Sequence, residues 1–191
     1  MKTRILAAAL GLAFSAGAFA QAGTVQRDVN QQERIEQGLK SGQLNTQEAA
    51  RLEREEARVE RDQARAMQDG KLTPAEKQRL AREQNQVSRD IYREKHDAQT
   101  GNPNSASSQR MQADVQRNIN QQKRIEQGLQ SGSLTTREAA KLERGQARDS
   151  RMEGRAGADG HVSAGEQHRI QRAENHQSRR IYREKHDGQA K

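Results

Sequence analysis

The sequence predicts an all-α protein in which two tandem three-helix units follow a signal peptide. Residues 25–97 align with residues 115–187 without a gap, and 42 of the 73 aligned pairs are identical, so the chain is a tandem duplication. Junctions with helix-stop and helix-start residues divide each copy into three segments. Apolar residues in these segments recur at spacings of four and seven, which is typical of narrow helical stripes.

The first element, residues 1–20, has the pattern of a signal peptide. Lys2 and Arg4 precede an apolar run that is too short to span a bilayer as a mature helix, and a small-x-small site ends at Ala20. We expect cleavage after Ala20, a periplasmic or secreted protein, and no transmembrane segment in the mature chain.

The first repeat unit, residues 21–97, is predicted to form helices over about 25–40, 46–68 and 74–96. Each junction between helices carries a glycine, then an apolar residue, an N-cap residue and a glutamate that completes a capping box. In that order, the junction residues are Gly42, Leu44, Asn45 and Glu48; Gly70, Leu72, Thr73 and Glu76; Gly132, Leu134, Thr135 and Glu138; and Gly160, Val162, Ser163 and Glu166. These four junctions set the helix order in both copies.

The next segment, AQTGNPNSASSQRMQ at residues 98–112, has the glycine, proline and serine content of a flexible linker. The second unit, residues 113–191, repeats the three helices. Its middle helix carries Gly145, Gly154 and Gly157, each of which weakens a helix by up to ~1 kcal/mol. Asp149 and Gln177 also replace two aliphatic residues of the first copy. We therefore expect the second copy to be the weaker fold.

Composition predicts a thin core. Without residues 1–20, Leu, Ile and Val account for 20 of 191 − 20 = 171 residues, and the chain has no cysteine to form a disulfide. Basic and acidic residues number 15 and 15 in residues 25–97, but 15 and 10 in residues 115–187. The surplus positive charge therefore belongs to the second copy.

Arginines recur at steps of three and four along the middle helix of each copy, which places them on one line. In the second copy many of the acidic neighbours of that line are lost. A bare line of arginines can bind phosphates or carboxylates through paired hydrogen bonds. The alternative is that the arginine stems shield the core. The candidate anion-binding residues are Lys141, Arg144, Arg148, Arg151, Arg155, Arg169, Arg172, Arg179 and Arg183.

The helix–loop–helix pattern, with a glycine, an apolar residue and a glutamate at the sixth, eighth and twelfth places, resembles a degenerate EF-hand. The resemblance implies calcium ligands at the first and third places, but Arg65 and Met67 stand there in the first copy, and Arg155 and Gly157 in the second. We expect any calcium site to be weak. The remaining candidate ligands are Asp69, Thr73, Glu76, Asp159, Ser163 and Glu166.

The heptapeptide IYREKHD ends each copy and contains the only tyrosines, Tyr92 and Tyr182. We expect these tyrosines to cover the thin core with their hydroxyls in water. His96, with Glu94 and Asp97, is a candidate for a weak transition-metal site.

No motif of an enzyme is present, and no cofactor is expected. Nucleic acid is an unlikely partner because the mature chain lacks stacking aromatic residues. Residues 34–44 and 124–134 carry R-I-E-Q-G-L-x-S-G-x-L, and the chain resembles uncharacterised exported tandem-repeat helical proteins of Gram-negative bacteria. The resemblance implies compartment and repeat architecture only. The sequence predicts a non-enzymatic binding or scaffold protein that contacts an anionic envelope component or an acidic protein; weak divalent-cation binding is the alternative.

Overall fold

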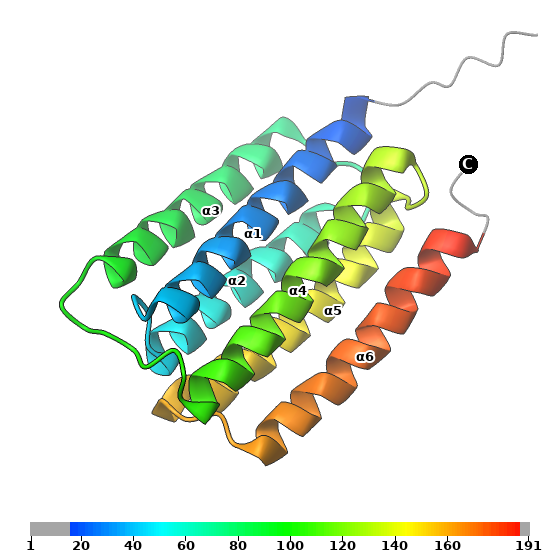
Figure 1. Cartoon of the computed structure of the whole chain (residues 1–191). Coiled ribbons are helices and arrows are strands. Elements are labelled where there is room, and N and C mark those ends of the chain that lie inside the picture. Colours follow the sequence, from blue (N-terminus) through cyan, green and yellow to red (C-terminus); the bar gives the residue numbers. More distant parts are fainter. Residues whose placement is uncertain (1–15, 188–191) are drawn as a thin grey trace, which may run out of the picture.

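The protein is all-α in the computed structural model, which describes residues 16–187 (Figure 1). The elements are α1 (Ala16–Ser41), α2 (Thr46–Ala66), α3 (Pro74–Lys95), α4 (Ala106–Ser131), α5 (Thr136–Ala156), a short 3-10 helix η1 (Gly157–Asp159) and α6 (Ala164–His186). No strand occurs among these residues. Most of the expected signal peptide, residues 1–15, lies outside the described residues, and residues 16–20 begin α1.

The four predicted junctions are confirmed. Gly42, Gly70, Gly132 and Gly160 all have positive φ, at 75°, 89°, 70° and 87°, a conformation that favours glycine. A complete capping box starts α2, α3, α5 and α6, with the predicted N-cap residue and the predicted glutamate in each case. These caps satisfy backbone N–H groups that a helix start would otherwise leave without partners.

The segment predicted as a linker, residues 98–112, is shorter than expected, because α4 begins at Ala106. The side chain of Ser105 caps this helix by accepting a backbone N–H, and Met111 is fully buried in the core. One of the serines that give this segment the composition of a linker therefore caps a helix.

The remaining connection packs closely on the turn between α1 and α2. The backbone N–H of Gly101 donates to the carbonyl of Gly42 at 2.8 Å. A Cβ atom on Gly101 would lie 2.4 Å from the carbonyl oxygen of Leu44, so only glycine allows this approach. Backbone contact thus holds the connection in place.

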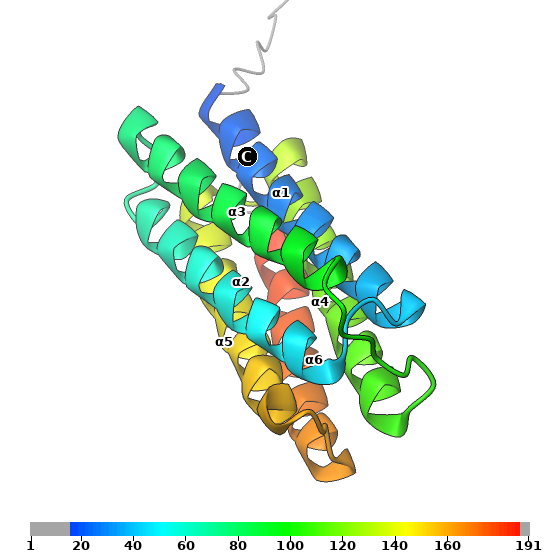
Figure 2. The same ribbon diagram turned by 90° about the vertical axis from the view of Figure 1, so that its left-hand side faces the viewer.

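The two copies interlock. The most extensive helix contacts are those of α2 with α5 and of α1 with α4, so each joins equivalent helices of the two copies. Figures 1 and 2 show α1 and α4 in one layer and α2 and α5 in the other, with α3 beside the first copy and α6 beside the second. The architecture is a central four-helix bundle with one flanking helix on each side.

The core uses every aliphatic residue that follows position 20, since all 20 Leu, Ile and Val side chains are buried. They form two clusters, and each cluster contains residues of both copies. Leu44 and Leu52, for example, belong to the same cluster as Val115 and Ile119. Neither copy therefore assembles its core from its own residues alone.

Tyr92 and Tyr182 do not cover the core, contrary to expectation. Their exposed fractions are 60% and 59%, and each ring stacks on the histidine four residues later, at centroid separations of 4.1 and 4.2 Å. Among the described residues, no helix is long and apolar enough to cross a membrane.

Small residues allow α2 and α5 to approach closely. Ala50, Ala57 and Ala64 on α2, and their counterparts Ala140, Ala147 and Gly154 on α5, recur every seven residues. A Cβ atom on Gly154 would lie 2.7 Å from the carbonyl oxygen of Ala50, and one on Gly157 would lie 2.8 Å from the Cβ of Ala50. Two of the glycines predicted to weaken the second copy are therefore needed for contact between the copies.

The third glycine, Gly145, makes room for Gln177. A Cβ atom at this position would lie 2.0 Å from Gln177 Oε1, and the Gln177 amide donates to the carbonyl of Leu142 at 2.7 Å. The first copy has Glu55 and Val87 at the two corresponding positions. The pair has thus changed together between the copies.

This pairing predicts a recoverable defect. Gly145→Glu is expected to lower the free energy of unfolding by about 1–3 kcal/mol, because the new side chain displaces Gln177. Adding Gln177→Val, which recreates the first copy's pair, is expected to restore most of that loss. Urea denaturation of both single variants and the double variant measures the coupling, and strictly additive effects would contradict it.

Candidate functional site

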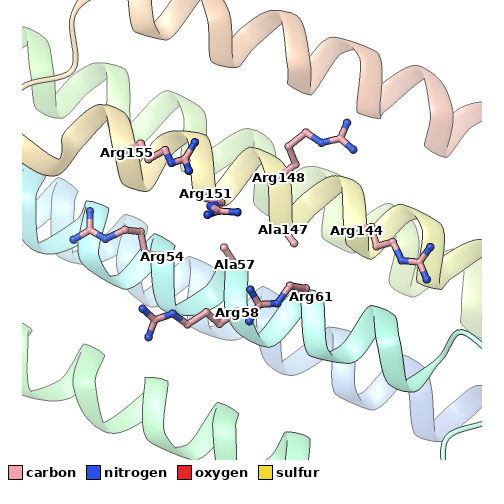
Figure 3. A pocket seen from close by; sticks show the side chains of 9 residues that line it. All are labelled: Arg54, Ala57, Arg58, Arg61, Arg144, Ala147, Arg148, Arg151 and Arg155. Carbon is pink, nitrogen blue, oxygen red and sulfur yellow. The ribbon is translucent and has the colours of Figure 1, made fainter.

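Seven arginines from both copies line a groove between α2 and α5 (Figure 3). The groove has a volume of about 420 Å³, with Ala57 and Ala147 at its floor. Its arginines are Arg54, Arg58, Arg61, Arg144, Arg148, Arg151 and Arg155. We refer to these seven residues and the two alanines as the arginine groove.

The duplication explains this convergence. Ala57 and Ala147 are equivalent positions of the two copies, and they meet where α2 and α5 pack together. Because equivalent helices pair here, the arginine line of one copy lies beside the arginine line of the other. Six of the seven arginines form three pairs of equivalent residues, one from each copy: Arg54 and Arg144, Arg58 and Arg148, and Arg61 and Arg151.

Most of these guanidinium groups have no partner among the residues that the structure describes. Arg54 donates to the carbonyl of Gly154, and Arg61 Nε lies 3.5 Å from the carboxylate of Asp62. The other five make no hydrogen bond or ion pair with any residue in the described part of the chain; they are Arg58, Arg144, Arg148, Arg151 and Arg155. The groove therefore concentrates positive charge that the ion pair of Arg61 with Asp62 offsets only in part, which favours an anionic ligand.

The predicted anion-binding residues are only partly brought together. Arg144, Arg148, Arg151 and Arg155 lie in the arginine groove, whereas Lys141 on the same helix does not line it. The four predicted residues of α6 lie elsewhere. Arg179 and Arg183 line a second cavity, Arg169 lines a third, and Arg172 lines no described cavity.

Sequence reasoning missed the arginines of the first copy, Arg54, Arg58 and Arg61. They were visible as a line, but the neutral charge of that copy suggested a purely structural role. The alanines spaced by seven on α2 and α5 were the signal that these two helices pair and merge their arginine lines.

Beneath the groove, the opposite faces of α2 and α5 carry acidic side chains into the bundle. The nine carboxyl side chains with at most 2% exposure are Asp28, Glu53, Glu56, Glu60, Asp114, Glu143, Asp149, Glu153 and Glu174. We call them the buried carboxyl cluster. No Lys, Arg or His side chain of residues 21–187 is buried with them.

Amides and one hydroxyl supply part of the hydrogen bonding inside this cluster. Glu60 accepts from Gln122 Nε2 and from Ser150 Oγ, both at 3.0 Å, and Glu153 accepts twice from the Asn118 amide at 2.9 Å. Neither carboxyl oxygen of Glu56 has a hydrogen-bond partner among the described residues. An ionised carboxylate without a partner is costly in such surroundings, so the interior favours the protonated form.

Burial accordingly raises the pKa values of the cluster. The pKa of Asp28 rises to about 7 and that of Glu53 to about 8, in both cases mainly through loss of hydration. Burial also raises the pKa of Glu56 and of Glu60 well above the usual range, and neighbouring carboxyl groups raise both further. The bundle interior therefore takes up protons near neutral pH.

One acid–amide pair is exchanged between the copies. The first copy places Asp28 and Gln63 at the positions where the second places Asn118 and Glu153. All four side chains are fully buried. Each copy therefore keeps one carboxyl and one amide at these positions, on opposite helices.

The candidate calcium ligands in the predicted EF-hand-like loops serve local structure. Asp69 Oδ1 accepts the backbone N–H of Lys71 at 2.9 Å, and Glu76 Oε2 accepts the backbone N–H and the hydroxyl of Thr73 at 2.9 and 2.6 Å. The second copy repeats this with Asp159 and His161, and with Ser163 and Glu166. These oxygens shape a turn and cap a helix, and they do not gather into a ligand set among the described residues.

His96 also makes local contacts that differ from the transition-metal site predicted for it. Its Nδ1 lies 2.7 Å from the carbonyl oxygen of Tyr92, and its ring stacks on the ring of that residue. Glu94 and Asp97 lie instead beside Glu48.

Comparison of the chain with protein-family models, with curated proteins and with solved structures gave no match.

Proposed function

We propose that the protein is a non-enzymatic, exported helical binding protein whose arginine groove holds an anionic partner. The observation that carries this proposal is the set of five guanidinium groups in one groove without a hydrogen bond or ion pair to any described residue. The signal-peptide pattern of residues 1–20 supports a periplasmic or secreted location.

The chemistry of the groove favours a ligand with several closely spaced negative groups. A guanidinium group donates two parallel hydrogen bonds to a phosphate or carboxylate, and neighbouring guanidinium groups repel one another until an anion lies between them. A polyanionic envelope lipid and an acidic protein segment both meet this requirement. Nucleic acid is less favoured, because neither tyrosine lines the groove and no base could stack there.

The proposal differs from the sequence prediction in one respect: both copies contribute to binding. Arg54, Arg58 and Arg61 come from the first copy, so the surplus charge of the second copy is not the whole basis of the site. The two units also share their hydrophobic clusters. Binding is therefore a property of the whole chain.

Binding of the full chain to vesicles that contain phosphatidylglycerol is expected to weaken steeply as salt concentration rises. The double substitution Arg148→Gln and Arg151→Gln removes two unpaired guanidinium groups, and we expect at least a tenfold loss of affinity. The slope of log affinity against log salt is expected to fall by about two, roughly one for each contact removed. Vesicle co-sedimentation across a salt series measures both quantities.

The matched control is Arg89→Gln with Arg79→Gln on α3, outside the groove; it removes the same charge and is expected to leave affinity nearly unchanged. An acidic peptide of glutamates in place of vesicles tests the acidic-protein alternative. Equal loss in the groove variant and the control variant, or binding that is independent of salt, would refute the proposal.

A further inference from the structure

The repeated heptapeptide meets the capping box of the middle helix at the same place in both copies. In the first copy, carboxylate oxygens of Glu48, Glu94 and Asp97 all lie within 4.8 Å of one another. In the second copy, Glu138, Glu184 and Asp187 form the same arrangement. We call each group of three an acidic triad. Glu48 lies 46 residues before Glu94 in the chain (94 − 48 = 46), so only the fold brings the triad together.

One buried carboxylate oxygen of the first triad has no hydrogen-bond partner among the described residues, which indicates a ligand. Glu48 is 6% exposed, and its Oε2 accepts the backbone N–H of Asn45 at 2.9 Å. Its Oε1 is buried and has no hydrogen-bond partner among the described residues. Burial raises the pKa of this group, and the carboxylates of Asp97 and Glu94 raise it further. This buried oxygen belongs to a side chain that lies beside two further carboxylates, so it lacks a positive partner among the described residues.

Nearby arginines satisfy this need only in part. Arg51 Nη1 lies 3.1 Å from Glu94 Oε1, and Arg93 lies 3.4 Å from the same oxygen. Asp97 is exposed, and its Oδ1 accepts the backbone N–H of Gln99. The triad is therefore open to solvent on the side of Asp97 and closed on the side of Glu48. An ion could enter from the open side and keep some of its bound water.

We propose that the first acidic triad binds a hard divalent cation such as Ca²⁺ or Mn²⁺, and that the second triad, which repeats its three residues, binds another. All three protein ligands are carboxylates, and no His or Cys side chain belongs to either triad. Oxygen-only ligand sets are typical of Ca²⁺, Mg²⁺ and Mn²⁺, whereas imidazole and thiolate ligands favour Zn²⁺ and Cu²⁺ or Cu⁺. With three carboxylates and an open side, the expected dissociation constant is about 10⁻⁴–10⁻³ M, as for extracellular calcium modules.

The site also gives a role to the heptapeptide IYREKHD. It supplies two of the three ligands of each triad, at its fourth and seventh residues. Tyr92 and Tyr182 lie in the same heptapeptides and are the only tyrosines, in a chain without tryptophan. Each triad thus carries its own aromatic reporter close by.

Terbium luminescence of the full chain tests the proposal. Tb³⁺ is a hard ion that takes calcium sites and emits when a nearby tyrosine transfers excitation energy to it. We expect tyrosine-sensitised emission that saturates at two ions per chain, one for each triad, and that excess Ca²⁺ displaces. Asp97→Asn is expected to remove about half of the emission, and Asp97→Asn with Asp187→Asn nearly all of it.

The control substitutions lie in the EF-hand-like loops. Asp69→Asn with Asp159→Asn makes the same chemical change at the aspartates of the predicted calcium loops and is expected to leave the emission intact. Glu94→Gln with Glu184→Gln supplies a second pair of triad variants, and circular dichroism confirms that each variant is helical. Emission that survives both triad pairs, or that disappears with the loop variant, would overturn the proposal. Because the arginine groove plays no part in it, failure of either test leaves the other proposal standing.

Discussion

Raising the pH from 5 to 9 is expected to lower the stability of this protein steeply. In the folded state, burial raises the pKa values of Asp28, Asp114 and Asp149 to about 7, that of Glu53 to about 8 and that of Glu174 to about 9. In the unfolded chain these groups titrate near 4. The folded state therefore binds more protons. The stability this provides is fully present below about pH 4 and is lost progressively as the pH rises from there through the folded-state pKa values of 7 to 9.

The expected size of this effect is large compared with typical protein stability. For Asp28 alone, a shift of the pKa from 3.8 to about 7 corresponds to about 4 kcal/mol between the two limits. A domain is usually stable by only about 5–15 kcal/mol, so a few such groups decide whether the bundle is folded at high pH. Thermal melts followed by circular dichroism at constant ionic strength provide the measurement. A melting temperature that is flat or rising from pH 5 to 9 would contradict the protonated interior.

Glu56→Gln gives this prediction a matched variant. The equivalent residue of the second copy is Gln146, which is also fully buried, so an amide is already compatible with this position of the helix. The substitution removes a carboxyl group that lies near Asp28, Glu53 and Glu60. We expect a higher melting temperature at pH 8, little change at pH 5, and a shallower dependence on pH.

Local signals predicted the helices accurately because each helix start is built from residues close together in the sequence. Thr73, Pro74 and Glu76, for example, begin α3 where the capping box and the N1 proline place it. The same reasoning failed at Ser105, where serines indicated a linker although one of them caps α4. A serine is common in both settings, and only the burial of Met111 one turn and a half later distinguishes them.

The partners of the helices were not predictable from such signals. A duplicated chain can pack each copy on itself or against the other, and both arrangements bury the same apolar stripes. The spacing of Ala50, Ala57 and Ala64 favours the second arrangement, because small residues every seven positions allow a close approach of two helices. Unless α2 is known to pair with α5, the arginine lines of the two copies are predicted to lie on two separate surfaces of different net charge.

The acidic interior was missed for a physical reason. A glutamate beside a leucine on a helix is ordinarily ionised and faces water, so nothing in the sequence indicates that Glu53, Glu56 and Glu60 are buried. They are fully buried because the apolar residues of α2 are too few to cover its contacts with α1, α3, α4, α5 and η1. Protonation and amide partners make this burial tolerable, and neither is visible in the order of the residues.

Gly154→Leu is expected to separate α2 from α5 and to cost about 3 kcal/mol or more. An added Cβ alone would lie 2.7 Å from the backbone oxygen of Ala50 and 2.5 Å from the side chain of Arg54. Backbone at this distance can yield only by a shift of the whole helix, since protein interiors are tightly packed. Urea denaturation measures the loss of stability, and the vesicle assay is expected to show weaker binding because the arginine lines move apart.

Gly165→Ala and Gly23→Ala are the matched controls. Both glycines are helical, and an added Cβ at either position meets no atom within 4 Å. Replacing them is expected to stabilise the helix by up to about 1 kcal/mol, as for exposed helical glycines in general. If Gly154→Leu were as harmless as these two, the close approach of α2 and α5 would be wrong. The arginine groove would then have no floor at Ala57 and Ala147, and the two copies would not share a binding site.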